Sequence, residues 1–217
     1  MNIIFDYDGT LHETIHIYEP AFREAYAYLV ENGYAEAREF STEEIQKWVG
    51  YSSRDMWRTF MPELPEEVRV HCSEIVGLRM KAEVEAGNAK LYKNVIRILE
   101  HLKENGHTLI FLSNCKERYM QAHTKAFELD KYFDAMYCAE YFDFIPKAEI
   151  LPEIMKKYPG EYIVVGDRAN DIEMGIKNGF YTIGCRYGYG TVDEIKAADA
   201  IVNFPLDILS FIPENVF

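Results

Sequence analysis

The sequence lacks the cysteine pattern of a zinc protein or of a disulfide-rich scaffold. It has four cysteines, and none of them forms a short pair with another: Cys72, Cys115, Cys138 and Cys185. Zinc sites and disulfide frameworks both need closely patterned cysteines, so we exclude these classes. Reduced and mostly buried thiols are expected instead, as in cytosolic proteins.

Long apolar runs are also missing. The longest runs are Leu109–Leu112 and Ile163–Val165. A membrane-spanning helix needs roughly 20 apolar residues, so we expect no membrane partner. A strand-like segment stands at the start of the chain, where a secretory leader would be basic and then apolar. We therefore expect a cytoplasmic location.

Positive charge is scarce relative to negative charge. The 217 residues carry 23 lysines and arginines against 36 acidic residues, a net charge of −13. Such a balance argues against nucleic acid as the main partner, and solubility is its simplest explanation. The length suffices for one good core, or for a core plus a small second domain.

The beginning of the chain holds the first chemical pattern. Ile3–Phe5 is a short apolar run that predicts a buried parallel strand, and Asp6, Asp8 and Gly9 follow it. In an extended backbone residues 6 and 8 point to the same side. Two such carboxylates repel each other unless a cation lies between them, and Mg²⁺ is the natural candidate. An ordinary turn rich in Asp and Gly is the alternative.

The chain divides into two kinds of pattern. Residues 15–87 show helical patterns only, at Tyr18–Val30, from Ser41, from Ser52 or Ser53, and at Glu66–Glu85. The rest alternates strands with helices, which predicts an α/β fold with a doubly wound parallel sheet. The expected later strands are Thr108–Leu112, Ala135–Cys138, Tyr162–Val165, Tyr181–Gly184 and Ala200–Val202. The expected later helices are Lys93–Asn105, Glu117–Leu129, Lys147–Tyr158, Asn170–Asn178 and Val192–Ala197.

Polar residues follow several of these strands, where ligands bind in open α/β sheets. Ser113 and Asn114 come directly after a strand, and would suit a phosphate or, alternatively, a simple helix N-cap. Lys147 begins a helix, where a cation opposes the helix dipole. A bound phosphate beside Asp6 would favour it there, but an exposed surface lysine is the alternative.

Two more carboxylates follow a later strand, after Gly166. Asp167 and Asp171 are four residues apart, so one helical turn can bring both toward the same site. A capping aspartate with a solvated partner is the alternative. Together these groups suit a Mg²⁺ ion plus a phosphoryl group.

The motifs occur in the order Asp6-x-Asp8-Gly-Thr, Ser113-Asn114, Lys147 and Gly-Asp167-x-x-x-Asp171. In this order they resemble the haloacid dehalogenase-like hydrolase superfamily, over nearly the whole chain. The insertion between the first two motifs is similar to the helical cap of its phosphoglycolate phosphatase and β-phosphoglucomutase-like branch. The resemblance implies a Rossmann-like core domain over residues 1–14 and 88–217 and a cap domain over residues 15–87.

The resemblance also implies roles for single residues. Asp6 would be the nucleophile that forms an aspartyl-phosphate, and Asp8 the general acid and then the base. Mg²⁺ would be held by Asp6, the Asp8 carbonyl and Asp167, with Asp171 in support. The phosphoryl oxygens would be bound by Ser113, Asn114 and Lys147. An acid at residue 8 favours phosphoryl transfer, because halide release needs no proton.

These implications predict a Mg²⁺-dependent phosphatase that acts on a small phosphorylated metabolite. A phosphomutase shares all the motifs, and a non-catalytic phosphate-binding protein is a more distant alternative. Lys147 is followed by Ala148, whereas the family often has proline there. The substrate and the oligomeric state stay open.

Other residues near the motifs have weaker signals. Arg54 resembles a cap residue that touches substrate in relatives, although a solvated helix arginine is the alternative. The family varies at His12, which is expected to be a surface or packing residue. Tyr187–Gly190 follows a late strand and is expected to be a connection only, with a position at the border of the site as the alternative.

Overall fold

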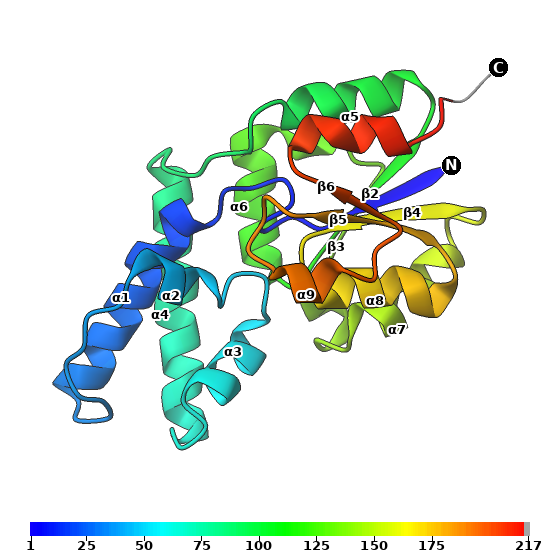
Figure 1. Ribbon diagram of the computed structural model, residues 1–217. Helices are drawn as coiled ribbons and strands as arrows, with labels where there is room; N and C mark the ends of the chain where they lie inside the picture. The colour runs from blue at the N-terminus through cyan, green and yellow to red at the C-terminus, as the bar shows by residue number, and fades with distance from the viewer. Residues whose placement is uncertain (215–217) are drawn as a thin grey trace.

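The fold is built on one parallel sheet. The computed structural model describes residues 1–214, in which six strands lie in the order β3-β2-β1-β4-β5-β6 (Figure 1). Every neighbouring pair of strands is parallel. The strands are β1 (Asn2–Phe5), β2 (Thr108–Ser113), β3 (Ala135–Cys138), β4 (Tyr162–Gly166), β5 (Tyr181–Cys185) and β6 (Ala200–Val202). The predicted α/β fold class with a doubly wound parallel sheet is confirmed.

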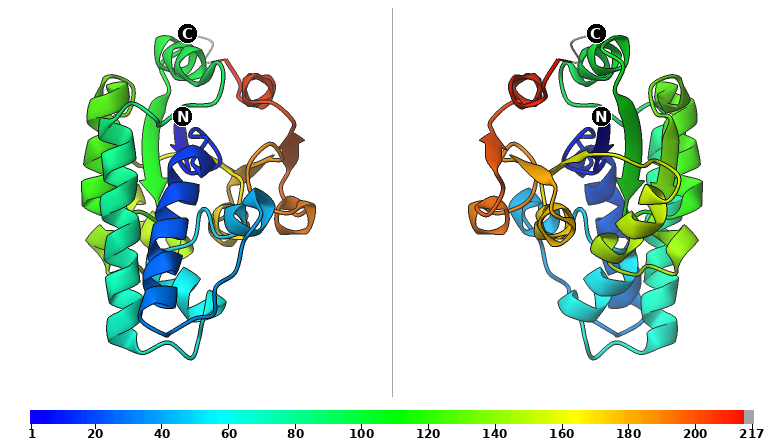
Figure 2. Two further views of the ribbon diagram at one scale, coloured as in Figure 1. Left: turned by 90° about the vertical axis from the view of Figure 1, so that its left-hand side faces the viewer. Right: turned by 90° about the vertical axis from the view of Figure 1, so that its right-hand side faces the viewer.

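Helices cover both faces of this sheet (Figures 1 and 2). On one face lie α5 (Val95–Glu104), α6 (Glu117–Phe127) and the 3₁₀ segments η1 (Leu129–Lys131) and η3 (Pro205–Phe211). The other face carries α7 (Lys147–Met155), α8 (Ala169–Asn178), α9 (Val192–Ile195) and η2 (Ala139–Phe142). The helix α5 begins two residues later than the sequence predicts, because Asn94 adopts a left-handed conformation at its N-cap.

The alternation along β1 separates two layers of the core. Ile3 and Phe5 are fully buried in the cluster on the α5 face, whereas Ile4 is fully buried in the cluster on the α7 face. Such near-continuous burial is typical of a central parallel strand with helices on both sides. The carboxyl end of β1, which leads to Asp6, is thus held firmly in the middle of the sheet.

The segment between β1 and α5 is helical. It contains α1 (Ile15–Glu31), α2 (Thr42–Gln46), α3 (Ser53–Phe60) and α4 (Glu66–Glu85), which we call the helical insertion. In Figure 1 it lies to one side of the sheet, where α1 runs along α4 and α4 packs against α6. Its division from the core as a domain of residues 15–87 stays a prediction. No helix within residues 1–214 is both long and apolar enough to cross a membrane.

Candidate active site

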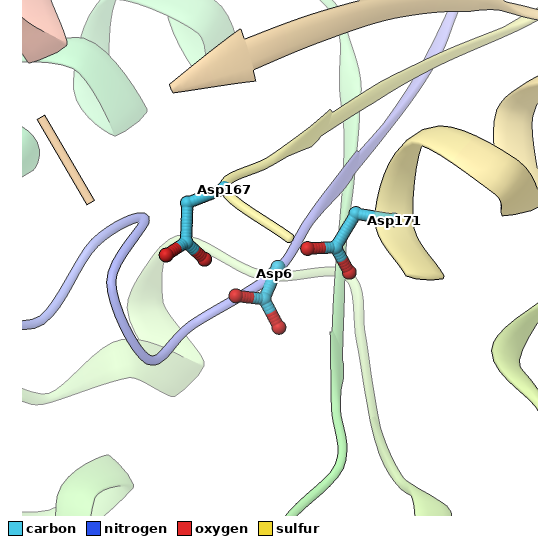
Figure 3. Close-up of side chains that lie close together, drawn as sticks. All are labelled: Asp6, Asp167 and Asp171. Atoms are coloured by element: carbon cyan, nitrogen blue, oxygen red, sulfur yellow. The ribbon is translucent and has the colours of Figure 1, made fainter. Parts of the chain in front are cut away.

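Three carboxylates meet at the carboxyl ends of the central strands. Asp6 follows β1, Asp167 follows β4, and Asp171 lies in the first turn of α8 (Figure 3). One oxygen from each lies within 4.8 Å of the others, and all three side chains are buried. The strands β1 and β4 are neighbours in the sheet, so adjacent strand ends bring together residues that are far apart in the sequence.

Lys147 lies against this carboxylate cluster. Its Nζ donates to Asp6 Oδ1 at 2.5 Å and to Asp171 Oδ1 at 2.7 Å. Only 2% of Lys147 is exposed, so its interpretation as a surface lysine is wrong. Lys147 is the first residue of α7, after Pro146, and its side chain extends from the start of this helix to the cluster.

The cluster contains more acidic groups than basic groups. Burial raises the pKa of Asp6 to about 7, and the charge of Asp171 adds to the rise while Lys147 opposes it. Burial together with Asp6 and Asp171 also raises the pKa of Asp167 well above its usual range. Burial lowers the pKa of Lys147, but the carboxylates of Asp171 and Asp6 outweigh it and raise that pKa. One ammonium does not balance three buried acids, so a further cation would stabilise the ionised site.

Backbone amides also orient Asp167. Its Oδ2 accepts from the N–H groups of Tyr189 at 2.7 Å and Gly190 at 3.3 Å. The loop Tyr187–Gly190 therefore borders the site, and the prediction that it is only a connection is wrong. Gly9, with φ of +92°, faces Asp167 across the site, where a β-carbon would collide with the Asp167 carboxylate. Glycine at residue 9 permits this close approach.

Asp8 follows Asp6 by two residues, but its carboxylate bonds a different set of side chains. Its Oδ1 accepts from the hydroxyls of Thr14 at 2.8 Å and Tyr119 at 2.6 Å. Burial alone would raise the pKa of Asp8, but His12 and the Tyr119 hydroxyl hold it below its usual value. Asp8 therefore occupies a different electrostatic environment from Asp6, although the two are two residues apart.

Ser113 and Asn114 lie on the neighbouring side of the site. Ser113 is the last residue of β2 and is buried, and α6 begins only at Glu117. The alternative that Ser113 is a helix N-cap is therefore wrong, because Lys116 occupies that position. Asn114 Nδ2 donates to the Gly50 carbonyl oxygen at 2.9 Å, which ties the core to the helical insertion.

A cavity of about 110 Å³ lies between these core loops and the helical insertion. On the core side it reaches Asp6, Asp8, Thr14, Ser113, Asn114, Cys115, Lys116, Arg118, Tyr119 and Phe144. On the insertion side none of the lining residues is charged: Tyr18, Trp48, Val49, Gly50, Tyr51, Ser53, Met56, Trp57, Ser73, Val76, Gly77 and Met80. The cavity is thus charged on one side and mostly apolar on the other.

The predicted substrate residue Arg54 is not among the residues that line this cavity. It is exposed on α3, and its neighbour Ser53 reaches the cavity instead. Two cations that the sequence analysis did not select, Lys116 and Arg118, do line it, and both bind Glu74 of α4 at 2.8 Å and 2.7 Å. Their positions soon after Ser113 were the available signal, since loops at strand ends supply ligand groups.

His12 is fully buried, so it is a packing residue and not a surface residue. Its ring stacks on Tyr7 with centroids 5.2 Å apart, and its Nδ1 lies 2.8 Å from Thr14 Oγ1. These contacts could not be predicted, because Thr14 and Tyr7 lie within a few residues of His12 without any regular spacing.

Comparison with known proteins places this site in a family. The model of a family described as haloacid dehalogenase-like hydrolase matches residues 3–185. The chain belongs to this family. The predicted family resemblance is thereby confirmed.

Curated relatives include several phosphoglycolate phosphatases. One from Haemophilus influenzae is 34% identical over 105 residues, which are 46% of this chain and 47% of the relative. The aligned region thus spans about half the length of that relative. Another, from Vibrio parahaemolyticus, is 27% identical over 99% of this chain and 95% of the relative. A 5'-nucleotidase from Pseudomonas aeruginosa is 27% identical over 50% of this chain and 51% of its own.

Solved structures share the fold at lower sequence identity. A predicted phosphoglycolate phosphatase from Haemophilus somnus superposes with a TM-score of 0.79 at 22% identity, over 96% of each chain. CbbY from Rhodobacter sphaeroides superposes with a TM-score of 0.76 at 18% identity, over 95% of each chain. Both likenesses concern the arrangement of the whole chain, including the helical insertion.

Proposed function

We propose that this protein is a Mg²⁺-dependent phosphatase that hydrolyses a small phosphomonoester through an aspartyl-phosphate on Asp6. The observation that carries the proposal is the buried carboxylate cluster with Lys147, next to a cavity of about 110 Å³. Family membership and the names of the curated relatives support the same reaction class.

The donor atoms of the cluster fit a hard divalent cation. All the donors are carboxylate oxygens, and burial together with their mutual repulsion raises the pKa of Asp6 and Asp167. Oxygen ligands of this kind are typical of Mg²⁺ sites. The ion would be held by Asp6, Asp167, Asp171 and the Asp8 backbone carbonyl. It would supply positive charge that shields Asp6 from the anionic substrate.

The first half of the reaction transfers the phosphoryl group to Asp6. A carboxylate oxygen of Asp6 attacks phosphorus as the bond to the leaving oxygen breaks, and Asp8 gives that oxygen a proton. Lys147, Ser113 and Asn114 would bind the phosphoryl oxygens and stabilise the charge that they carry in the transition state. An alcohol and the aspartyl-phosphate are the products of this half.

The second half regenerates the enzyme. Asp8, now ionised, takes a proton from a water molecule as its oxygen attacks phosphorus. The bond between phosphorus and the Asp6 oxygen breaks, which releases inorganic phosphate and restores the Asp6 carboxylate. Asp8 keeps the proton that it took from water, so it can again act as the acid in the next cycle.

The substrate would place its phosphate against the core side and its alcohol part against the helical insertion. A cavity of about 110 Å³ suits a small alcohol. Phosphoglycolate is the first compound to test, because curated relatives bear that name.

The experiment is phosphate release from a panel of phosphomonoesters, measured with Mg²⁺ and with a chelator. Asp6→Asn is the test variant, and Asp130→Asn, at an exposed acid of η1, is the matched control. We expect Mg²⁺-dependent release that Asp6→Asn abolishes and Asp130→Asn leaves unchanged. Full activity of Asp6→Asn would exclude the covalent route.

The panel also separates the alternatives. A phosphomutase would transfer phosphate between positions of a sugar phosphate with little release, which phosphorus NMR detects. A folded protein that binds Mg²⁺ but changes none of the substrates would be a binding protein on this fold. Either result would overturn the proposal of a phosphatase.

A further inference from the structure

The Asp8 carboxylate is bonded asymmetrically. Its Oδ1 accepts from Tyr119 at 2.6 Å and from Thr14 at 2.8 Å, and His12 Nδ1 lies 3.5 Å from the same oxygen. Within residues 1–214 no hydrogen-bond partner of Asp8 Oδ2 is found. Two hydroxyl donors on one oxygen fix the plane of the carboxyl group and keep the other oxygen available for a proton.

Tyr119 reaches Asp8 from a different part of the chain. It lies in α6, 111 residues from Asp8, and both residues line the cavity. The Tyr119 side chain is almost fully buried, with 8% of the residue exposed, so water competes little with its bond to Asp8. At 2.6 Å this is a short hydrogen bond.

A cluster of polar aromatic residues supports this contact. His12 Nδ1 lies 2.8 Å from Thr14 Oγ1 and 3.4 Å from the Tyr119 hydroxyl. Behind it, the His12 and His123 rings lie 4.6 Å apart, and His123 Nδ1 lies 2.7 Å from the Tyr7 hydroxyl. These residues fill the space between the first loop and α6, so they hold Tyr119 against Asp8.

Burying these polar aromatic side chains lowers the stability of the protein. His12 and His123 are fully buried, and the Nε2 of each has no hydrogen-bond partner within residues 1–214. An unsatisfied buried polar atom typically costs about 1–3 kcal/mol, whereas aliphatic side chains would fill the same space without that cost. A role beyond packing would account for polar aromatic residues here.

We propose that Tyr119, supported by His12, is a positioning residue that orients the Asp8 carboxylate so that Oδ2 faces the leaving oxygen of the substrate. This inference rests on the proposed function, in which Asp8 is the general acid. Tyr119 itself exchanges no proton with the substrate. Its hydroxyl stays bonded to Oδ1 while the proton on Oδ2 moves to the leaving oxygen.

A positioning role predicts a dependence on the leaving group. Alkyl phosphates need a proton on the departing oxygen, whereas p-nitrophenolate leaves without one. In Tyr119→Phe we therefore expect kcat/KM to fall by roughly 10- to 100-fold for alkyl phosphates. For p-nitrophenyl phosphate we expect a change of less than about twofold. If the substitution only disturbed the folded structure, kcat/KM would fall to the same extent for both kinds of substrate.

The experiment compares Tyr119→Phe with the native protein and with Tyr141→Phe on both kinds of substrate. Tyr141 is an exposed tyrosine whose hydroxyl bonds Glu117, so it controls for the loss of a hydroxyl–carboxylate bond. A supporting variant, His12→Phe, removes the bond to Thr14, and we expect the same selectivity with a smaller fall. An equal fall on both substrates, or none on alkyl phosphates, would overturn the proposal.

A second measurement does not depend on turnover. Crystal structures of the native protein and Tyr119→Phe would compare the Asp8 side chain directly. We expect the carboxyl group to rotate when the Tyr119 hydroxyl is removed, and an unchanged orientation would refute the positioning role. If the native protein releases no phosphate from any substrate, the proposed function fails, and the crystal structures still test the contact.

Discussion

The two sides of the cavity differ in charge and in origin. The core side carries Asp6, Asp8, Lys116 and Arg118, and the carboxylate cluster with Lys147 lies next to it. The insertion side carries no charged residue among those that line the cavity. Charged groups on the sheet loops would act on the phosphate, and the uncharged helical side would select the alcohol. Chemistry and selectivity would then reside in different parts of the chain, as is common for folds that host many substrates.

The two sides of the cavity also differ in how their residues are held in place. The carboxylates are held by strand ends and backbone amides, such as the bonds from Tyr189 and Gly190 to Asp167. The insertion side is built from aromatic contacts, such as Trp57 stacked on Phe22 with centroids 6.3 Å apart. Strand ends give precise positions, while apolar contacts tolerate changes of shape. Substitutions on the two sides should therefore have different kinds of effect.

The largest expected effect is that of Asp6→Asn on the core side. We expect activity to fall by at least about 1,000-fold, because the amide is a poor nucleophile. In the absence of metal we expect the melting temperature at pH 8 to rise, because one charge is removed from a crowded acidic cluster. Calorimetry with a chelator measures this rise. A melting temperature lower than that of the native protein would contradict the electrostatic account.

The next effect is that of Lys147→Met. Lys147 is the partner of Asp6 and Asp171, so its loss leaves buried carboxylates without their ammonium. We expect the free energy of unfolding to fall by about 3–5 kcal/mol without metal. Urea unfolding measures it, with Lys125→Met at an exposed position of α6 as the control. Equal stability of the two variants would show that the ion pairs do not hold the core side together.

The pH dependence of stability provides a third test. The pKa of Asp6 is about 7 in the folded protein and is raised from 3.8, its usual value, so the folded state binds more protons between these values. Without metal, stability should therefore fall as the pH rises from about 5 through 7, on the order of a few kcal/mol. Mg²⁺ should stabilise the protein more at pH 8 than at pH 5, because its ligands are then ionised. If the stability of the metal-free protein instead rose between pH 5 and pH 7, the raised pKa of Asp6 would be refuted.

The smallest expected effect lies on the insertion side. Tyr18 is 7% exposed, and its hydroxyl has no hydrogen-bond partner within residues 1–214. If the hydroxyl contacts the alcohol part of the substrate, Tyr18→Phe should raise KM by roughly 3- to 10-fold with kcat unchanged. Tyr34→Phe, at an exposed tyrosine, is the control. A fall in kcat with KM unchanged would contradict the idea that the insertion side only binds the alcohol part of the substrate.

Local patterns were enough to predict the sheet and the motif residues at its edge. The apolar run Ile3–Phe5 followed by Asp6 predicted a buried strand that ends on a carboxylate, and β1 has this form. The alternation of strand and helix patterns predicted the parallel sheet, because this order of elements permits few other arrangements. The strand that precedes Asp167 was predictable for the same reason.

Contacts between distant segments were not predictable. The sequence could not show that Lys147 is buried against Asp6, 141 residues away, since a lone lysine is usually solvated. It could not show that the loop Tyr187–Gly190 contacts Asp167. For Arg54 the resemblance suggested a substrate contact, but α3 leaves this residue exposed, and Ser53 reaches the cavity.

The strands that form, and the acids and cations at their ends, follow from local periodicity and residue chemistry, so the amino-acid sequence is enough to predict them. The protonation and the orientation of those groups depend on contacts that exist only in the folded protein. The pKa of Asp6 depends on burial and on Asp171, and Asp8 accepts a hydrogen bond from Tyr119 of α6. Electrostatic and hydrogen-bonding effects of this kind act through space, so they are set only when the folded chain brings the partners together.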